Sequence, residues 1–401
     1  METQKKAFLI LEDGTVFTGI SIGADKEIIS EIVFNTSMAG YLEVLTDPSY
    51  AGQAVCMTYP LIGNYGICRD DFESKRPWPD GFIVRELSRT HSNFRSEMSI
   101  QDLLAEFDVP GIAGIDTRAL TKILREKGTM NGMITTNSQY QLEEVLPRLK
   151  VYTTGKVVEK VSCKEKWQWK GTTDLAENGP LSGSARFSKE AFERGEKELK
   201  PSMVKSLNGK GYHIALMDFG AKSNIPRSLA QRGCDVTIFP AWTSAEEILA
   251  SNPDGIMLSN GPGDPKECTG IIEEIKKLYA SDVPIFAICL GHQLMALANG
   301  ADTHRLKYGH RGGNHPVKDL ETGRVYISSQ NHGYVVDTEH LDPAVAVPAF
   351  VNVNDGTNEG LRYIGKNIFT VQFHPEACPG PQDSGYLFDR FIAMIAEGKK
   401  A

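Results

Sequence analysis

Hydrophobic and polar positions follow two different patterns along the chain, and the change between them falls near its middle. In the first third, short apolar runs are interrupted by Gly, Asp and Pro, which is typical of β-strands joined by turns. The runs that predict strands span residues 7–11, 15–20, 28–34, 54–59 and 81–87. The pair Asp13 and Gly14 lies between the first two runs and indicates a β-hairpin.

Two helices are predicted in the same third, over residues 99–107 and 117–127. The apolar residues of the second recur at helical spacing, which gives that helix one apolar face. Asp116 or Thr117 can cap its amino end, and Gly128 follows its last basic residues as a stop signal.

The periodicity fades between residues 156 and 211, where basic residues outnumber acidic ones and Gly and Ser become frequent. This composition predicts a linker over residues 156–211, between a β-rich α/β domain at residues 1–155 and a second domain at residues 212–401. Within the linker, residues 178–202 are expected to form a solvated surface segment, with an added docking or regulatory element as the alternative.

From residue 212 onward, apolar runs alternate with helical stretches. Strands are predicted at residues 213–219, 235–241, 255–259, 283–288, 325–336 and 367–373, and helices at residues 224–233, from Thr243 and from Leu290. Thr243 and Glu246 have the spacing of a capping box. Strands that alternate with helices predict a mostly parallel sheet with crossover connections, and hence an α/β domain.

Length and composition are those of an ordinary multidomain globular protein. The chain has 401 residues, enough for two or three domains, and its 41% hydrophobic and 23% charged residues exclude wholesale disorder. Its 43 basic and 51 acidic residues give a net charge of −8. Because an acidic chain is not attracted globally to phosphate backbones, and no local basic face is found, we expect no nucleic-acid partner.

Cysteine usage and hydrophobicity indicate the cellular compartment. The seven cysteines are odd in number and never spaced C-x-x-C, which argues against a disulfide framework and against a zinc knuckle. The apolar run at residues 7–11 is too short for a signal-peptide core, and no segment reaches the roughly 18 apolar residues of a membrane span. We therefore expect a cytoplasmic protein with no membrane partner.

Cys289 is the strongest candidate for chemistry. It lies where the predicted strand at residues 283–288 passes into the helix that begins at Leu290. A sharp strand-to-helix turn lifts a side chain clear of the sheet, and a helix amino terminus lowers the pKa of a thiol, which favours the thiolate. Taken alone, however, a cysteine is more often a small buried apolar residue, so other residues must decide between these interpretations.

His374, Pro375 and Glu376 favour the catalytic interpretation. They follow the predicted strand at residues 367–373, and residues i and i+2 of a strand project to the same side. Glu376 can then orient His374, which can move protons to and from Cys289, as in a Cys-His-acid triad.

The loop Asn-Gly-Pro-Gly-Asp-Pro at residues 260–265 is a candidate oxyanion site. It follows a predicted strand, and its glycines allow the backbone to approach a ligand closely enough for free N–H groups to hold an oxyanion. The alternative is a simple tight turn.

Two other patterns are rejected. Residues 360–367 have the spacing of a phosphate-binding loop, but the segment ends in Asn367 rather than Ser or Thr and precedes an apolar run rather than a helix. His310 and His315 are close in sequence but lack helical spacing and a third ligand. We therefore expect no metal site.

Three motifs, NGPGDP, ICLGHQ and HPEA, occur in the order found in triad-type glutamine amidotransferases, which the carboxyl-terminal half therefore resembles. Nearly the whole chain resembles the small, glutaminase subunit family of carbamoyl phosphate synthetase; only residues 178–202 resemble nothing recognisable. The strings that carry this resemblance are SMAGYLEVLTDPSYAGQ, YPLIGNYG, GIDTRALTKILREKGTMNG, DFGAKSNI, GHRGGNHPV and SQNHGY.

The resemblance implies a set of site residues. It implies a catalytic triad of Cys289, His374 and Glu376, and glutamine binding by Ser49, Gly261, Gly263, Leu290, Gln293, Asn331, Gly333 and Tyr334. The chain departs from the family at two positions, with Ala287 in place of the usual Gly and Tyr334 in place of the usual Phe. We expect neither to abolish activity, since alanine adds only a methyl group and tyrosine keeps the ring.

The resemblance also implies a fold and a partner. The carboxyl-terminal domain is expected to be a mostly parallel α/β amidotransferase domain with a strand-nucleophile-helix elbow, and residues 1–155 are suspected to dock a large subunit. That subunit is expected to hold ATP and a divalent cation and to make carbamoyl phosphate, for arginine or pyrimidine synthesis, from bicarbonate and the ammonia released here. No cofactor is expected on this chain.

Two alternatives remain open. A stand-alone cysteine hydrolase accounts for the triad but not for an additional amino-terminal domain. A non-catalytic regulatory or scaffold subunit would tolerate loss of the triad, whereas all three triad residues are present here.

Overall fold

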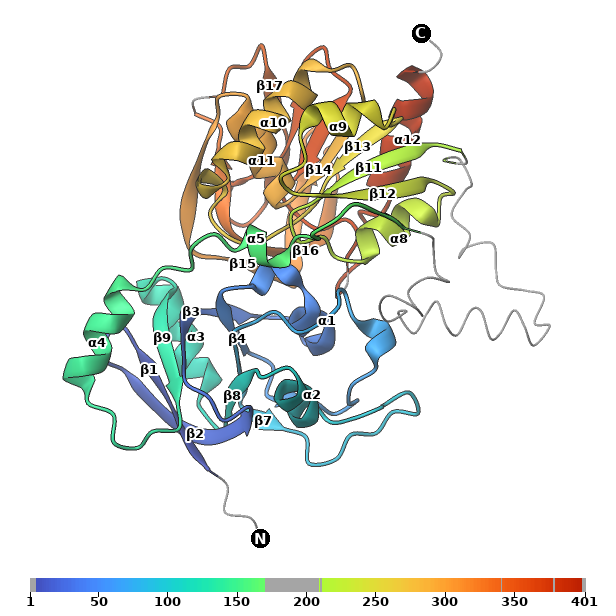
Figure 1. The fold of residues 1–401 in the computed structure, drawn as a ribbon. Helices are drawn as coiled ribbons and strands as arrows, with labels where there is room; N and C mark the ends of the chain where they lie inside the picture. The colour runs from blue at the N-terminus through green and yellow to red at the C-terminus, as the bar shows by residue number, and fades with distance from the viewer. Residues whose placement is uncertain (1–4, 170–208, 210, 340, 378, 399–401) are drawn as a thin grey trace.

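The fold was analysed in a computed structural model that describes residues 5–169, 209, 211–339, 341–377 and 379–398. Figure 1 shows two stacked parts, the amino-terminal third in blue and green below and the carboxyl-terminal half in yellow to red above. The chain ends lie at opposite ends of the molecule. The predicted surface segment at residues 178–202 lies outside the described residues.

The amino-terminal part is a closed β-barrel with strand order β1-β2-β8-β6-β4-β3-β9. Its strands are β1 (Lys6–Leu11), β2 (Val16–Gly23), β3 (Ile28–Asn35), β4 (Gln53–Met57), β6 (Gly81–Ile83), β8 (Pro110–Ala113) and β9 (Met130–Thr135). The side chains of β1 alternate between the two faces of the barrel wall. Leu9 and Leu11 join one buried cluster, whereas Ile10 packs in another. The predicted hairpin is confirmed, since β1 and β2 pair antiparallel.

One predicted strand of this part is wrong in extent. Residues 81–87 do not form a single strand: β6 ends at Ile83, and β7 (Glu86–Leu87) pairs with β5 (Leu61–Ile62) in a separate two-stranded sheet. The apolar run continues through Val84, but Val84 N bonds to Ile112 O beyond the end of β6 and the chain then turns away from the barrel. Apolar character alone therefore does not determine which strand a residue pairs with.

The helices of this part are α1 (Tyr41–Thr46), α2 (Ile100–Glu106), α3 (Thr117–Lys127) and α4 (Leu142–Val151). The prediction for α3 is confirmed, because Asp116 accepts a hydrogen bond from Ala119 N and Gly128 ends the helix with a φ of 101°. A glycine is favoured there because a side chain rarely adopts a positive φ.

The described start of the predicted linker is ordered. It contains α5 (Val158–Val161) and β10 (Trp167–Trp169), and β10 pairs antiparallel with β12 (Asp235–Pro240) of the carboxyl-terminal sheet. Trp169 is buried against that sheet. This apolar contact is not evident from the composition of the linker, which is polar on average. The domain limits 1–155, 156–211 and 212–401 stay a prediction.

The carboxyl-terminal half is built on a ten-stranded sheet with order β10-β12-β11-β13-β14-β19-β18-β17-β15-β16. Its further strands are β11 (His213–Asp218), β13 (Gly255–Leu258), β14 (Ile285–Ile288), β15 (Asp302–Asp319), β16 (Val325–Asp337), β17 (Ala346–Asn352), β18 (Asn358–Tyr363) and β19 (Ile368–Val371). Strands β12, β11, β13, β14 and β19 are parallel, and the pairings on either side of them are antiparallel. The parallel centre carries the candidate site.

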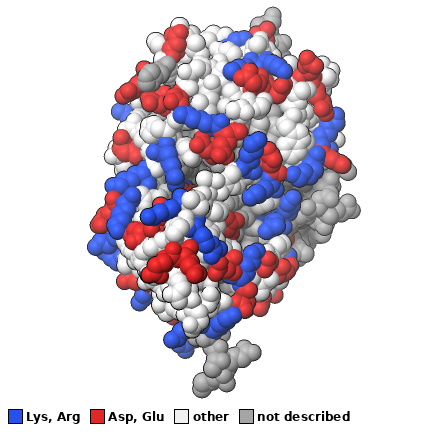
Figure 2. All heavy atoms as spheres, turned by 60° about the vertical axis from the view of Figure 1, so that its left-hand side comes forward, with Lys and Arg blue, Asp and Glu red and all other residues white. Residues whose placement is uncertain are grey.

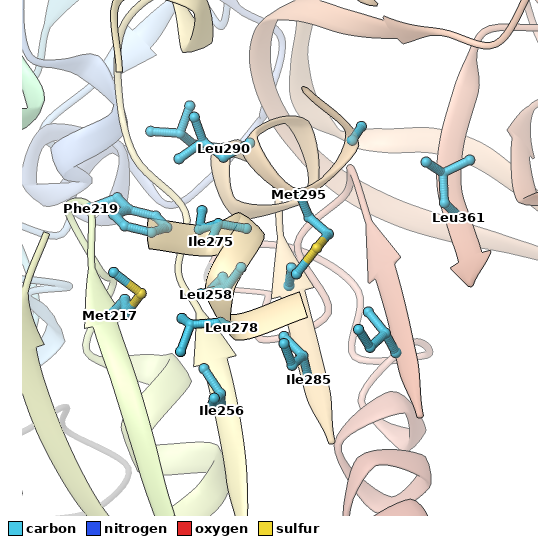
Figure 3. Packing of buried hydrophobic residues seen from close by; sticks show 14 of the residues in the cluster. Met217, Phe219, Ile256, Leu258, Ile275, Leu278, Ile285, Leu290, Met295 and Leu361 are labelled. Carbon is cyan, nitrogen blue, oxygen red and sulfur yellow. The ribbon is translucent and has the colours of Figure 1, made fainter. Parts of the chain in front are cut away.

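Helices pack on both faces of this sheet: α8 (Asn224–Ala230), α9 (Ala245–Ala250), α10 (Thr269–Ala280), α11 (Leu290–Ala298) and α12 (Tyr386–Gly398). Neighbouring residues of β13 and β14 point to opposite faces and enter different clusters. Figure 3 shows one face, where Leu258 and Ile285 meet Leu278 of α10 and Met295 of α11. On the other face, Phe286 stacks on Phe369 and packs against α12.

Two predicted helix boundaries are corrected. The cap of α9 is Ser244, whose hydroxyl accepts from Glu247 N at 3.2 Å, so the predicted capping box of Thr243 and Glu246 is displaced by one residue. Helix α8 ends at Ala230 rather than at residue 233. At α9 the sequence offers two adjacent residues that can cap a helix, Thr243 and Ser244, and the structure uses the second. After α8, residues 231–233 form a turn instead of a further helical turn.

The surface gives two further facts. Among the described helices, none combines the length and the apolar character needed to cross a membrane. On the face drawn in Figure 2, basic and acidic side chains are interspersed, and no extended basic area forms there.

Candidate active site

Cys289 forms a sharp turn between β14 and α11, with φ 53° and ψ −106°. A positive φ is unusual for a residue with a side chain, so the fold holds this residue in a strained conformation. Its backbone N–H donates to Val371 O of β19 at 2.8 Å, which fixes the turn to the neighbouring parallel strand. Gly291 lets α11 pack on β13, since a Cβ there would lie 2.5 Å from Leu258 O. The predicted strand-to-helix elbow is thus present.

The thiol of Cys289 is buried, with 2% of the residue exposed, and Sγ lies 3.8 Å from Asn331 O. Burial raises the pKa of the thiol, and the negative charges of Asp47 and Glu376 act in the same direction. Lys222 and the Leu290 N–H oppose this change but do not outweigh it. The sequence-based expectation that the helix terminus lowers this pKa is therefore wrong for the structure without substrate, because desolvation dominates.

His374 and Glu376 follow β19 and are almost completely buried. His374 Nδ1 lies 2.7 Å from Glu376 Oε1, so the predicted proximity is present. Its cause is a turn at Pro375 and Glu376 rather than the alternation of a strand, because β19 ends at Val371. Lys222 Nζ lies 2.7 Å from the same oxygen. Burial alone would raise the pKa of Glu376, but Lys222 and His374 together lower it to about 2. The acid is therefore ionised, and it orients the imidazole by one nitrogen.

The other nitrogen of this imidazole is free. His374 Nε2 is buried and has no hydrogen-bond partner among the described residues. His374 lines a small void of about 10 Å³ together with Asp47, Lys222 and Asn331. Asn331 also lines the larger cavity that contains Cys289, so it borders both spaces.

The loop at residues 260–263 packs closely on the rest of the site. A Cβ on Gly261 would lie 2.3 Å from Phe219 O, and Gly263 has a φ of 94°. Glycine is required at both positions, the first by space and the second by conformation. Asn260 fixes the loop, since its Oδ1 accepts from Lys222 N and its Nδ2 donates to Ser49 Oγ at 2.9 Å.

Most of the predicted glutamine-binding residues surround one cavity of about 250 Å³. Those that line it, beside Cys289, are Ser49, Gly261, Gly263, Gln293, Asn331, Gly333 and Tyr334. Leu290 does not line it: its side chain packs beneath the loop and into the buried cluster of Figure 3. Because residues of the barrel such as Glu31 and Gln53 also line the cavity, it lies between the two parts of the chain.

Hydrogen bonds between the two parts hold the cavity wall. The short 3-10 helix η1 (Pro48–Tyr50) carries Ser49 from the barrel to the loop of the other part. Asp47, just before it, accepts from Asn331 Nδ2 at 2.9 Å. Gln293 donates to Tyr334 O at 2.9 Å and to Gln372 at 3.0 Å, which ties α11 to the edge strand β16 and to the end of the central strand β19.

The two departures from the family pattern have visible settings. Ala287 is fully buried in β14 and belongs to the core cluster, so its methyl group is accommodated by packing. Tyr334 contributes its backbone carbonyl to Gln293, while burial and the nearby Asp264 raise the pKa of its phenol to about 12. Neither residue disturbs the bonds of the triad.

Three residues of the site are not indicated by any sequence pattern as functional: Asp47, Lys222 and Arg311. Asp47 and Lys222 lie within the strings DPSY and DFGAKSNI, which carry the family resemblance. Arg311 lies in GHRGGNHPV and lines the cavity. A buried cation or acid cannot be recognised from sequence, because charged residues are mostly exposed and their partners are distant in the chain.

His310 has more neighbours than the sequence indicated. Ligand atoms of His310, His332 and Glu359 lie within 4.8 Å of one another, so a third group is close, although it is not His315. His310 Nε2 lies 2.7 Å from Asp355, and its Nδ1 lies 3.6 Å from Glu359. Burial lowers the pKa of His310, but these two carboxylates outweigh it and raise the pKa to about 9. The two carboxylates therefore favour the protonated form of His310.

The rejected phosphate loop is confirmed as a hairpin. Residues 360–367 run from β18 through a turn into β19, which pairs antiparallel with β18. No helix follows the turn within the described residues around it, so the helix terminus that holds phosphate in such loops is missing.

Comparisons with known proteins agree with this geometry. Residues 9–134 match the family model described as carbamoyl-phosphate synthase small chain, CPSase domain, and residues 215–394 match glutamine amidotransferase class-I. The carbamoyl phosphate synthase small chain of Fusobacterium nucleatum is 48% identical over 394 residues, 98% of this chain and 99% of that protein. The corresponding protein of Clostridium perfringens is 49% identical over 387 residues, 96% of this chain and 99% of that protein.

Among solved structures, a glutamine amidotransferase from Thermotoga maritima is similar over 47% of this chain and 86% of its own, with 17% identity and a TM-score of 0.34. The whole-length similarity to curated proteins is the stronger result, because both parts of the chain take part in it. This chain belongs to the carbamoyl phosphate synthase small chain family.

Proposed function

We propose that this protein is the glutamine-hydrolysing subunit of a carbamoyl phosphate synthetase. One observation carries the proposal: Cys289 lines a cavity between the two parts of the chain, and the Glu376 carboxylate nearby bridges His374 and Lys222 at 2.7 Å each. A buried thiol, an imidazole with one free nitrogen and an ionised acid are the groups that hydrolysis of a carboxamide requires.

The reaction begins with transfer of the Cys289 proton to His374 Nε2, while the sulfur attacks the side-chain carbonyl carbon of glutamine. Backbone N–H groups of Gly261 and Leu290 hold the resulting oxyanion. His374 then gives the proton to the departing nitrogen. Ammonia departs, and a glutamyl thioester remains on Cys289. His374 next takes a proton from water, the hydroxide cleaves the thioester, and the proton returns to the sulfur as glutamate is released.

Glu376 and Lys222 act on this sequence by position and charge. The carboxylate accepts a hydrogen bond from the Nδ1–H group of His374, which leaves Nε2 to exchange protons with the sulfur. Lys222 neutralises the buried carboxylate, so Glu376 stays ionised through the cycle. The raised pKa of the thiol makes proton transfer part of the attack rather than a preceding equilibrium.

The ammonia passes to a large subunit, which uses ATP, a divalent cation and bicarbonate to form carbamoyl phosphate. The names of the relatives support such a partner, since each is called a small chain. We assign docking of this partner to the domain at residues 1–155 and glutamine hydrolysis to the domain at residues 212–401, with the connection at residues 156–211. The barrel also lends Ser49 and Asp47 to the cavity wall.

The test is reconstitution with a large subunit. The native protein is copurified with that partner, and carbamoyl phosphate is assayed with glutamine or with ammonium as nitrogen source. We expect synthesis from both, and glutaminase activity of this chain that rises at least tenfold on assembly. A chain that hydrolyses glutamine equally well alone, and binds no large subunit, would be a stand-alone hydrolase and contradict the proposal.

A further inference from the structure

Arg311 is a buried cation on β15 that has no acidic partner in the part of the chain that the structure describes. Only 5% of the residue is exposed. Its Nη1 donates to Tyr308 O at 2.8 Å, but its Nε has no hydrogen-bond partner, and no carboxylate among the described residues lies within ion-pair distance of it. Burial lowers the pKa of Arg311 to about 10, which still leaves the guanidinium charged at neutral pH.

An unpaired buried charge is costly. Transfer of a guanidinium from water to a protein interior costs several kcal/mol, and native proteins offset such a cost with an ion pair or a bound ligand. Two other buried arginines among the described residues illustrate the rule: Arg232 pairs with Asp389 at 2.7 Å, and Arg227 lies 3.9 Å from Glu73. Arg311 lacks such a carboxylate, which indicates that its anion arrives with a ligand.

The guanidinium lies at the cavity that contains Cys289. It lies against Gly333, where a Cβ would be 3.2 Å from Arg311 Nη2, and against Gly309, where a Cβ would be 2.4 Å from Nη1. The backbone of β15 and β16 therefore fixes the head group in place. The second arginine at this cavity, Arg305, is already paired with Glu31.

We propose that Arg311 binds the α-carboxylate of glutamine and makes the cavity selective for substrates that carry this group. The inference rests on the proposed function, since it concerns the substrate of that site. A guanidinium presents two parallel N–H groups that match a carboxylate, and such charge-assisted bonds are strong where water is excluded.

The chemistry of glutamine singles out this end of the molecule. Its reacting end is a neutral carboxamide, its amino group is a cation, and the α-carboxylate is its one anionic group. A site with a buried guanidinium rejects analogues that lack the anion, because the charge would then stay buried and unpaired. Arg311 thereby distinguishes free glutamine from a glutamine residue whose carboxyl group is in a peptide bond.

The experiment measures binding without turnover. A Cys289→Ser chain, assembled with its large subunit, is titrated calorimetrically with L-glutamine and with glutamine α-amide, in which a neutral carboxamide replaces the α-carboxylate. We expect at least a thirtyfold preference for glutamine in this protein. The preference should fall below threefold when Arg311→Met is added, and Arg311→Lys should retain at least part of it because the cation remains.

Arg305→Met is the matched control, since it removes the other arginine of the cavity, and it should leave the preference above tenfold. A preference that persists in Arg311→Met, or affinities for both ligands that fall by the same factor, overturns the proposal. If Arg311→Met does not fold, Arg311→Gln is judged by the same ratio. A wild-type complex that does not hydrolyse glutamine would instead refute the proposed function, so the two failures are distinguishable.

Discussion

Two buried pairs of imidazole and carboxylate lie on the same sheet, and their charges are balanced in opposite ways. In the pair of His374 and Glu376, one acid serves two basic groups, because Lys222 contacts the same oxygen as the imidazole. In the pair around His310, one imidazole serves two acids, Asp355 and Glu359. Among the described residues, neither of these two acids forms an ion pair with another cation.

The difference explains why one pair fits catalysis and the other does not. Glu376 already has a cation in Lys222, which balances its charge while the carboxylate orients His374. His310 completes the charge balance of two carboxylates, and a raised pKa of about 9 keeps it protonated at neutral pH. A protonated imidazole cannot act as a general base. The surrounding charges, not the hydrogen bond to an acid, thus distinguish the two histidines.

The largest expected effect comes from removing the thiol of Cys289, with which His374 exchanges protons in the proposed reaction. Cys289→Ser should reduce glutamine hydrolysis by about 10⁴-fold or more, because a hydroxyl is a much weaker nucleophile than a thiolate. Synthesis from ammonium in the assembled complex should be unchanged, which serves as the control for folding. Wild-type glutaminase activity in the serine variant would show that the nucleophile is another group.

The comparison itself is tested by the same substitution in each pair. His374→Asn should lower kcat for glutamine by about 10³-fold, the usual range for loss of a general base. His310→Asn, which removes another buried imidazole, should lower kcat by less than about tenfold. If the two variants lost activity equally, the charge argument would be refuted. Steady-state kinetics and the melting temperature of both variants decide the matter.

The two glutamates should differ in the same way as the two histidines. Substitution of Glu376 should lower kcat more than substitution of Glu359, but the difference should be smaller than for the histidines. Glu376→Gln should lower kcat by about 10²-fold, less than His374→Asn, because the acid orients while the base transfers the proton. Glu359→Gln is the matched control and should stay within about threefold of wild type, since an amide oxygen can still accept from Gln330 and Asn352. Unchanged kinetics of Glu376→Gln would remove that residue from the triad.

The smallest effect concerns stability and pH. Glu376 has its pKa lowered from 4.5 to about 2, so its contribution is present above pH 4.5 and is lost as the pH falls toward 2. His310 has its pKa raised from 6.5 to about 9, so its contribution is full below pH 6.5 and is lost as the pH rises through 9. The two pairs should therefore weaken at opposite ends of the pH scale.

Urea unfolding of matched variants measures this difference. The gap in unfolding free energy between wild type and His310→Asn should shrink from about pH 6 to about pH 10. The gap between wild type and Glu376→Gln should shrink from about pH 5 to about pH 3. If both gaps shrank as the pH rises, or both as the pH falls, the assigned charge states would be wrong.

Much of the site was predictable because its parts are local in sequence. The helix at Thr117–Lys127 and the spacing of His374 and Glu376 depend on residues within one turn or two positions of each other. The elbow at Cys289 follows from one strand and the helix after it. Local periodicity contains this information, so the sequence predicts the geometry.

Other features depend on contacts between distant segments and were missed for that reason. Lys222 reaches Glu376 across more than 150 positions, and Asp47 reaches Asn331 across nearly 300. The thiol pKa was predicted in the wrong direction because the helix terminus is local, whereas burial arises from the whole fold. Strand β10 was hidden in a polar linker because only the distant β12 gives it a partner.

The 3-10 helix η1, which carries Ser49 across to Asn260, links substrate binding to the arrangement of the two halves of the molecule. A ligand that contacts both halves binds best when they are docked, and thermodynamic reciprocity then requires that the ligand strengthen the docking by the same factor. Under the proposed function, glutamine bound in the cavity contacts both halves and holds barrel and sheet together reversibly. Occupancy of the site then changes how strongly the two halves dock.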